Sequence, residues 1–261
     1  MRKQLTALYL LAATGLLLAV GGPKTFGQRH HYDDADLPER EETNQTYPLA
    51  PGARVDVSVI AGPVTIQTAN VAEATVHIVR SAETRADLDS FTIAIDHSPD
   101  SLTVRFRDLA HVENLKCRQN VTLTVPRNIN LRLNAIAGPV KVGEIDGSIH
   151  LTGISGRVDV EQAQGYSEIS GISGVLTVNI RQLSERGIHI SGISGRVELH
   201  LAEDLNANVS VSGIMGNIDI AGPNLSMTKL GSTTFSGRVG AGGAPISVSG
   251  ISGHVAFRGG I

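Results

Sequence analysis

Apolar and polar residues alternate over most of residues 54–258, as expected for β-strands that bury one face. Between these stretches a four-residue motif recurs, most often as Gly-Ile-Ser-Gly. The intervals between successive copies are 18, 18, 21, 21, 21 and 16 residues. The copies, three of them variants, start at Ala135, Gly153, Gly171, Gly192, Gly213, Thr234 and Gly250. A period near 20 residues predicts stacked structural repeats.

When the copies are aligned on the motif, apolar residues form columns at fixed offsets. One column consists of Ile136, Ile154, Ile172, Ile193, Ile214, Phe235 and Ile251. Counted from the motif start, the inward residues stand at even offsets before the motif and at odd offsets after it. Such a one-residue shift in a strand would turn its side chains to the opposite face. The chain must therefore turn a corner there, which the glycines allow. We predict an all-β parallel solenoid, or β-helix-like fold, over residues 135–261. A meander of hairpins fits less well, because antiparallel pairing would not align like columns.

Residues 49–134 are rich in strand patterns but lack the regular motif. The segment Ile60–Val64 has the same sequence as Ile136–Val140, which predicts that this region begins with one coil. The alternating stretches within Phe91–Phe106 flank Pro99-Asp100 and predict a hairpin insertion. We expect one continuous domain over residues 50–261.

The first 27 residues have the features of a secretory signal peptide. Arg2 and Lys3 precede an apolar run of 16 residues, Leu5–Val20, which is short for a membrane span of about 20 residues. We therefore expect cleavage near Gly27, an exported protein, and no transmembrane segment afterwards. Residues 28–48 contain six acidic residues and almost no apolar ones, which predicts a disordered acidic linker.

Charge and aromatic content exclude one class of partner. Cleavage of the signal would leave 19 basic and 25 acidic residues, and only 3% of all residues are aromatic. An acidic chain without interleaved aromatic and basic residues is a poor ligand for nucleic acid. Cys117 is the single cysteine, so no internal disulfide can form.

The order of these elements resembles a known family. The segment Val55–Ile66, the hairpin Phe91–Phe106, the strand Val121–Pro126 and the serial Ser-Gly corners are similar to the bacterial β-strand-repeat family called "putative adhesin", a domain-of-unknown-function family. The resemblance covers residues 50–261. It implies a right-handed β-solenoid in the bacterial envelope, and it brings no catalytic residues with it.

Two charged columns follow the corners and form a candidate ligand strip. Four positions after the motif start, basic residues recur, and six positions after it, acidic residues recur. The strip comprises Arg157, Arg196, Arg238, Asp159, Glu198 and Asp219. It is suited to a glycan or a phosphate. The alternative, which we favour, is a salt-bridged outer face that blunts edge pairing.

A second column contains His150, Glu168 and His189, three positions before the motif start. Histidine and carboxylate are transition-metal ligands, but residues two coils apart lie roughly 9.6 Å from each other. We therefore expect a solvated surface column and no metal or cofactor. Nor do the serines of the motif act as nucleophiles, because a hydrolase elbow has the pattern Gly-x-Ser-x-Gly and leads into a helix.

These patterns favour a non-enzymatic envelope protein, an adhesin-like binding or structural module of the periplasm or cell surface. One alternative is a polysaccharide-acting β-helix enzyme, although the loops 181–187 and 202–208 assemble no convincing acid/base pair. Another is a partner in envelope-stress sensing. The expected partners are an envelope protein, a glycan, or a second copy that docks on an open C-terminal edge formed by His254–Arg258.

Overall fold

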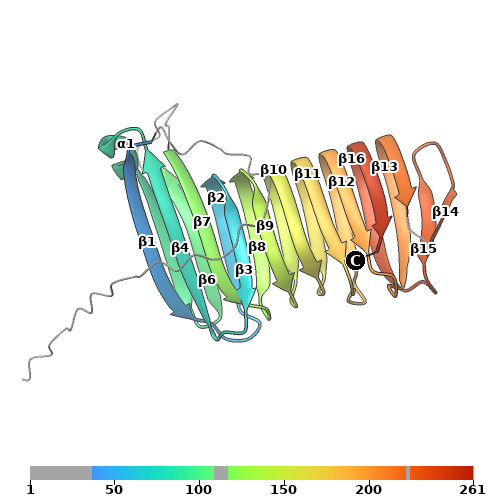
Figure 1. The fold of residues 1–261 in the computed structure, drawn as a ribbon, viewed down its shortest axis with the longest axis horizontal. Coiled ribbons are helices and arrows are strands. Elements are labelled where there is room, and N and C mark those ends of the chain that lie inside the picture. The colour runs from blue at the N-terminus through green and yellow to red at the C-terminus, as the bar shows by residue number, and fades with distance from the viewer. Residues whose placement is uncertain (1–36, 109–116, 222–223, 261) are drawn as a thin grey trace, which may run out of the picture. The chain divides into compact units, whose positions relative to one another are not determined.

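The computed structural model describes residues 37–108, 117–221 and 224–260, and the predicted signal peptide lies outside this part of the chain. The described residues form one 16-stranded sheet, whose strands lie in a row (Figure 1). The all-β prediction is confirmed.

The elements of the first half are β1 (Glu39–Pro48), β2 (Arg54–Ala61), β3 (Val64–Ala69), β4 (Glu73–Ala82), α1 (Arg85–Asp89), β5 (Phe91–Ser98), β6 (Ser101–Asp108), β7 (Cys117–Pro126), β8 (Asn130–Ala137) and β9 (Val140–Ile145). Those of the second half are β10 (Ile149–Ala163), β11 (Ser167–Ile180), β12 (Ile188–Leu201), β13 (Ala207–Ala221), β14 (Leu225–Lys229), β15 (Phe235–Val239) and β16 (Ala244–Gly259).

The long strands of the second half pair in parallel and in register. In β10 and β11, Ile154 lies opposite Ile172, and the same column continues through β12, β16 and β13. Each inward column therefore stacks like side chains on one another, at about 4.8 Å per strand. These columns belong to a single buried cluster that runs through both halves of the sheet and consists mainly of Ile, Val and Leu side chains.

The predicted corner lies inside each long strand. In β10, Gly153 has φ +63° and Gly156 has φ +145°, and the buried positions change phase between Leu151 and Val158. A Cβ on Gly156 would lie only 2.6 Å from the carbonyl oxygen of Gly138 on the neighbouring strand. The second corner position thus requires glycine because of close backbone stacking, whereas the left-handed backbone conformation at the first position favours glycine.

In the first half, the segment predicted as an early coil pairs in parallel with its counterpart. Ile60 pairs with Ile136, and Val64 pairs with Val140, so the two identical segments lie side by side in β2–β3 and β8–β9. The chain between them forms strands of mixed direction. β4 runs antiparallel to β7, and β5 and β6 form the expected hairpin.

The linker prediction is wrong for residues 39–48, which form strand β1. This strand pairs antiparallel with β4 along its whole length. Its composition is acidic, but alternate residues are half-buried, and Glu41 and Glu42 pair with Arg80 and His77 of β4. Because backbone pairing and ion pairs satisfy these residues, a low apolar content does not leave them disordered.

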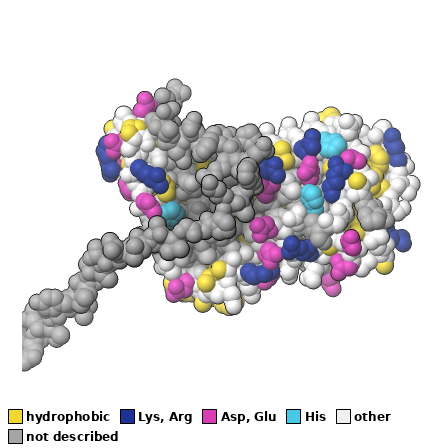
Figure 2. Space-filling model, in the orientation of Figure 1, with side chains coloured by type: hydrophobic (Ala, Val, Ile, Leu, Met, Phe, Trp, Pro, Cys, Tyr) yellow, Lys and Arg dark blue, Asp and Glu magenta, His cyan; other side chains and the backbone are white. Residues whose placement is uncertain are grey.

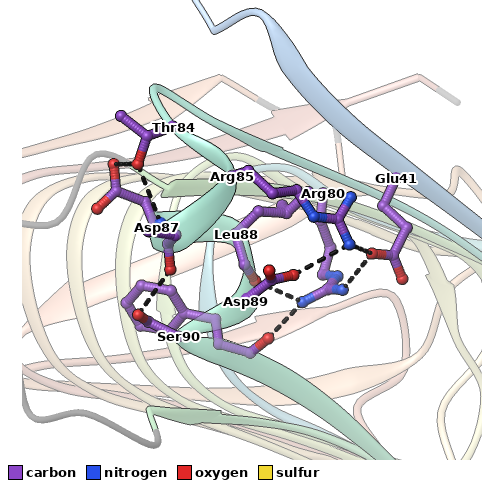
Figure 3. A network of polar contacts seen from close by, with 10 residues as sticks. Glu41, Arg80, Thr84, Arg85, Asp87, Leu88, Asp89 and Ser90 are labelled. Atoms are coloured by element: carbon purple, nitrogen blue, oxygen red, sulfur yellow. Dashed lines mark hydrogen bonds and ion pairs between the residues drawn. The ribbon is translucent and has the colours of Figure 1, made fainter.

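A short helix lies beside β1 and β4 (Figure 3). Thr84 caps its N-terminus, since the Thr84 hydroxyl accepts a hydrogen bond of 3.1 Å from the backbone N–H of Asp87. Its Leu88 is fully buried, and the Leu88 carbonyl accepts a hydrogen bond of 3.2 Å from Arg80. Arg80 also pairs with Glu41 at 2.8 Å, so one guanidinium links β1, β4 and α1.

Two expectations about the end of the repeat are wrong. The motif copy at Thr234 is not a further parallel coil, because β15 runs antiparallel to β13. The segment His254–Arg258 is not an open edge either, because β16 lies between β12 and β13 and pairs with both (Figure 1). β16 fits there since its Ile251 matches Ile193 on one side and Ile214 on the other.

Candidate functional site

Four members of the predicted charged strip lie together on the outer face of β10 and β12. Arg157 and Arg196 share one row with Val175 between them, and Asp159 and Glu198 share the next row. Within each strand the charges pair with each other. Arg157 Nε lies 2.8 Å from Asp159 Oδ2, and Arg196 Nη1 lies 3.3 Å from Glu198 Oε1.

The other two members of the strip lie elsewhere. Asp219 is two strands beyond Glu198 and pairs with Arg258 of β16 at 2.7 Å. Arg238 lies in β15, opposite Asn208, because this strand is not a parallel coil. The column alignment therefore placed Arg238 wrongly.

The strip is largely neutralised by its own pairs. The hydrogen bond that Arg157 donates to the Asp159 carboxylate raises the pKa of Arg157 above its ordinary value, so this arginine stays charged and paired. Figure 2 shows basic, acidic and histidine side chains interspersed on the visible face of this half of the sheet. Exposed pairs of this kind contribute little stability, and a ligand would have to displace one partner of each pair.

A different cluster, which we call the His–Tyr patch, consists of His150, Tyr166, Glu168, Arg186 and His189. Parallel pairing of β10, β11 and β12 aligns His150, Glu168 and His189 in one row, as predicted. His150 Nδ1 lies 3.4 Å from Glu168 Oε2. Residues 39 positions apart in the sequence are thus brought onto one face, two strands from each other.

Tyr166 joins the two histidines. It ends the turn before β11, and its ring centroid lies 5.8 Å from that of His150 and 5.7 Å from that of His189. Arg186, in the turn before β12, places its guanidinium carbon 4.0 Å from the centroid of the Tyr166 ring, a cation–π distance. The phenol ring is half-buried, whereas His189 and Arg186 are exposed.

A row of short polar side chains runs beside the patch across seven strands. We call it the hydroxyl row, and it consists of Ser58, Asn134, Thr152, Ser170, Ser191, Ser249 and Ser212. The hydroxyls of Ser170 and Thr152 lie 3.4 Å apart. Patch and row together present an aromatic ring, imidazoles, a guanidinium, a carboxylate and regularly spaced hydroxyls, which can donate and accept hydrogen bonds.

Sequence reasoning identified the three residues of the His-Glu-His row but missed Tyr166 and Arg186. Both lie in turns, outside the alternating columns, and their only signal is that each stands two or three residues before a member of the row. Among the described residues, no group of three or more His, Cys, Asp or Glu side chains is arranged to hold a metal ion.

A buried polar contact lies away from this face. Gln119 of β7 is almost fully buried, and its side-chain oxygen accepts a hydrogen bond of 2.7 Å from the backbone N–H of Ala61. Its side-chain nitrogen lies 3.7 Å from the sulfur of Cys117. Burial raises the pKa of the Cys117 thiol, and this outweighs the lowering effect of the Gln119 contact. The group is a structural link between β7 and the β2 corner.

Within the described ranges, no helix has the length and apolar character needed to cross a membrane. No family model matches the sequence. No curated protein matches it either.

Several solved bacterial proteins are similar to this chain at low TM-scores. A "putative cell adhesion protein" from Clostridium sporogenes has 10% identity and a TM-score of 0.39, over 84% of this chain and 100% of that one. A "putative adhesin" from Bacteroides fragilis has 10% identity and a TM-score of 0.33, over 84% and 98%. A "putative lipid binding protein" from Parabacteroides distasonis has 12% identity and a TM-score of 0.30, over 84% and 97%. At such TM-scores and identities, the function has to be inferred from this chain's own residues.

Proposed function

We propose that this chain is an exported, non-enzymatic, adhesin-like binding module of the bacterial envelope, at the periplasm or cell surface. It binds an envelope glycan through the His–Tyr patch and the adjoining hydroxyl row. The observation that carries the proposal is the Tyr166 ring, held between His150 and His189 at 5.8 and 5.7 Å. Export is inferred from the apolar, positively led N-terminal segment.

The architecture we propose is a right-handed parallel β-solenoid with coils of about 20 residues. Parallel, in-register pairing of β10, β11 and β12 supports it, as does the pair of corner glycines in each of these strands. Such stacking repeats the same outward position on every strand. A regular face of this kind matches a polymer, because a repeating ligand can make the same contact several times.

The chemistry of the patch is suited to sugar hydroxyls. Glu168 accepts hydrogen bonds, Arg186 donates them, and the imidazoles of His150 and His189 can do either. Tyr166 adds an apolar ring surface with a polar tip. An aromatic ring next to several polar side chains is the usual combination in a ligand site, where apolar contact supplies affinity and the polar groups fix orientation.

One observation favours binding over hydrolysis of a polysaccharide. Arg186 comes from the loop 181–187, one of the two loops in which an enzyme would keep its acid and base. Its guanidinium lies against the Tyr166 ring, while the neighbouring Glu185 is exposed. The loop therefore contributes to the patch rather than to a pair of carboxylates.

The test is binding of the chain from residue 28 to immobilised bacterial peptidoglycan and surface-polysaccharide fragments. The double variant Tyr166→Ala/His189→Ala should lower affinity about tenfold or more, since two side chains of the patch are lost. The matched control is Arg157→Ala/Asp159→Ala, which removes one ion pair of the charged strip, with no change in net charge, and leaves the His–Tyr patch intact. This control should bind as well as the unaltered chain. Thermal unfolding of each variant checks that the fold is intact.

Two results would overturn the proposal. If a folded patch variant binds as well as the unaltered chain, the patch is not the site. If reducing ends accumulate when the protein is incubated with the same polysaccharides, the protein is an enzyme. Retention of an envelope protein with no retention of any glycan would instead favour the stress-sensing alternative.

A further inference from the structure

The position of β16 within the sheet is out of sequence order. β12 and β13 are consecutive long strands, yet β16, the last described strand, lies between them and pairs in parallel with both. To reach this place, the chain leaves β15 at Val239, opposite Ala207, and enters β16 at Ala244, also opposite Ala207. The segment Gly240–Gly243 therefore passes from one side of β13 to the other.

β12 and β13 are matched to each other as well as to β16. Gly195 and Gly216 both lie opposite Gly253, just as Ile193 and Ile214 both lie opposite Ile251. The corner motifs of β12 and β13 are 21 residues apart, the same interval as those of β11 and β12, which pair directly. The space between β12 and β13 is thus a slot that fits one strand with the Gly-Ile-Ser-Gly pattern.

β16 makes almost all of its contacts with β12 and β13, the two strands that form the slot. Ile246, Val248, Ile251, Val255 and Phe257 are all fully buried. Removing the strand without replacement would expose these side chains, at roughly 1.5–3 kcal/mol each. An identical strand from another molecule would restore every contact, so exchange between two copies costs only association and hinge opening.

The connection to β16 has the features of a hinge. Gly240, Gly242 and Gly243 make up three of its four residues, and Gly240 and Gly242 have φ of +55° and +84°. A Gly-rich segment can adopt the extended conformation needed to reach a second molecule without steric cost. The link bridges two strand spacings, roughly 9.6 Å, in the closed arrangement.

We propose that the slot between β12 and β13 is a strand-binding site that accepts β16 from a second copy of this chain, producing a strand-exchanged dimer. The inference is independent of the glycan proposal. In such a dimer, β16 of the second copy would lie next to the His–Tyr patch. Ser247 of β16 lies opposite His189, and Ser249 is a member of the hydroxyl row.

Single-cysteine chains test this directly in a Cys117→Ala background. Ser191 and Ser249 are opposite each other on β12 and β16, at a spacing of about 4.8 Å that suits a disulfide. One chain carries Ser191→Cys and the other, with a mass tag, carries Ser249→Cys. Co-refolded and oxidised, the two should form a covalent heterodimer whose yield rises with protein concentration.

Two controls make the result decisive. The double variant Ser191→Cys/Ser249→Cys in one chain must form its disulfide within the monomer, which shows that the pair is competent. Replacing Ser191→Cys by Ser170→Cys moves the thiol one strand further away and should abolish the heterodimer. Deleting Ala241 and Gly242 should raise the exchanged fraction, because a shorter link cannot turn back across β13.

If the competent pair forms its disulfide within one chain but the two single-cysteine chains yield only monomers at every concentration, the proposal is wrong. A heterodimer that forms equally well with Ser170→Cys would also overturn it, since the contact would then be non-specific.

Discussion

Val59 and Ala135 occupy the same corner position on the neighbouring strands β2 and β8, and both have a left-handed backbone, with φ of +60° and +53°. Gly153 holds this position on the next strand, with φ +63°. A Cβ on Gly153 would still be 3.5 Å from its nearest neighbour, so this position has room for a side chain. The difficulty for valine and alanine is therefore conformational, since the left-handed region is unfavourable for any residue with a Cβ.

Val59→Gly should stabilise the protein. A β-branched residue in this region costs about 1–2 kcal/mol or more, and the greater flexibility of unfolded glycine offsets about 0.5–1 kcal/mol. The expected gain is about 1 kcal/mol in the free energy of unfolding, measured by urea denaturation. Val71→Gly is the control, because Val71 is similarly exposed but has no positive φ, and it should not stabilise. A lower midpoint for Val59→Gly would show that its side chain makes contacts that outweigh the strain.

The two glycines of one corner should respond differently to alanine. In β12, a Cβ on Gly195 would lie 2.0 Å from the carbonyl oxygen of Gly174, whereas a Cβ on Gly192 would be 3.7 Å from its nearest neighbour. Gly192→Ala should cost about 1–2 kcal/mol, from backbone conformation alone. Gly195→Ala must separate two stacked strands and should cost more than about 4 kcal/mol or prevent folding. Thermal unfolding compares them, and equal losses would contradict the stacking described for the corner.

Removal of the Arg80 side chain should loosen the end of the sheet formed by β1. Its guanidinium is mostly buried and bridges Glu41 and the carbonyls of Leu88 and Phe91 (Figure 3). Arg80→Met leaves these acceptors without their donor and should destabilise by about 2–3 kcal/mol. Arg85→Met is the control, since that side chain is largely exposed and should change stability by less than about 1 kcal/mol. Amide hydrogen exchange in β1 should rise only in the first variant.

Stability should fall at alkaline pH partly because of Cys117. Burial raises the pKa of this thiol in the folded state, so the folded protein holds the proton more tightly than the unfolded chain. The contribution is complete below the ordinary thiol pKa and is lost as pH rises through the raised one. Urea unfolding at about pH 7 and about pH 10 should therefore show a smaller alkaline loss for Cys117→Ala than for the unaltered chain. Equal losses would show that the thiol does not titrate differently on folding.

The sequence predicted the strands and their register well where one column repeats. Ile154, Ile172 and Ile193 stand at one offset, and a parallel stack is the arrangement that places such residues opposite one another. The order of strands could not be predicted in the same way. β16 carries the same Gly-Ile-Ser-Gly pattern as β12, so the pattern permits either as the neighbour of β13. Chain connectivity and the short strand β15 decide between them.

Composition and the aligned columns of the repeat were also insufficient to predict strand β1 and part of the His–Tyr patch. For β1, the acidic composition concealed an alternation in which Glu39, Glu41 and Thr43 are half-buried. For the candidate site, the columns predicted the row of His150, Glu168 and His189. They could not predict Tyr166, because the direction of a turn residue depends on turn length and not on strand period.

The hairpin and the antiparallel strands of the first half have a consequence for higher-order assembly. Among the described strands, β1 and β5 are outermost at that end of the row, and each runs antiparallel to the one strand with which it pairs. At β5, a parallel coil of another molecule would meet a strand that runs opposite to the stack. β1 runs in the same direction as β7, but it presents a series of charged residues. Head-to-tail growth needs two complementary ends. End-to-end addition of copies is therefore disfavoured at this end of the sheet, although the interior of the stack has the strand arrangement from which fibrils are built.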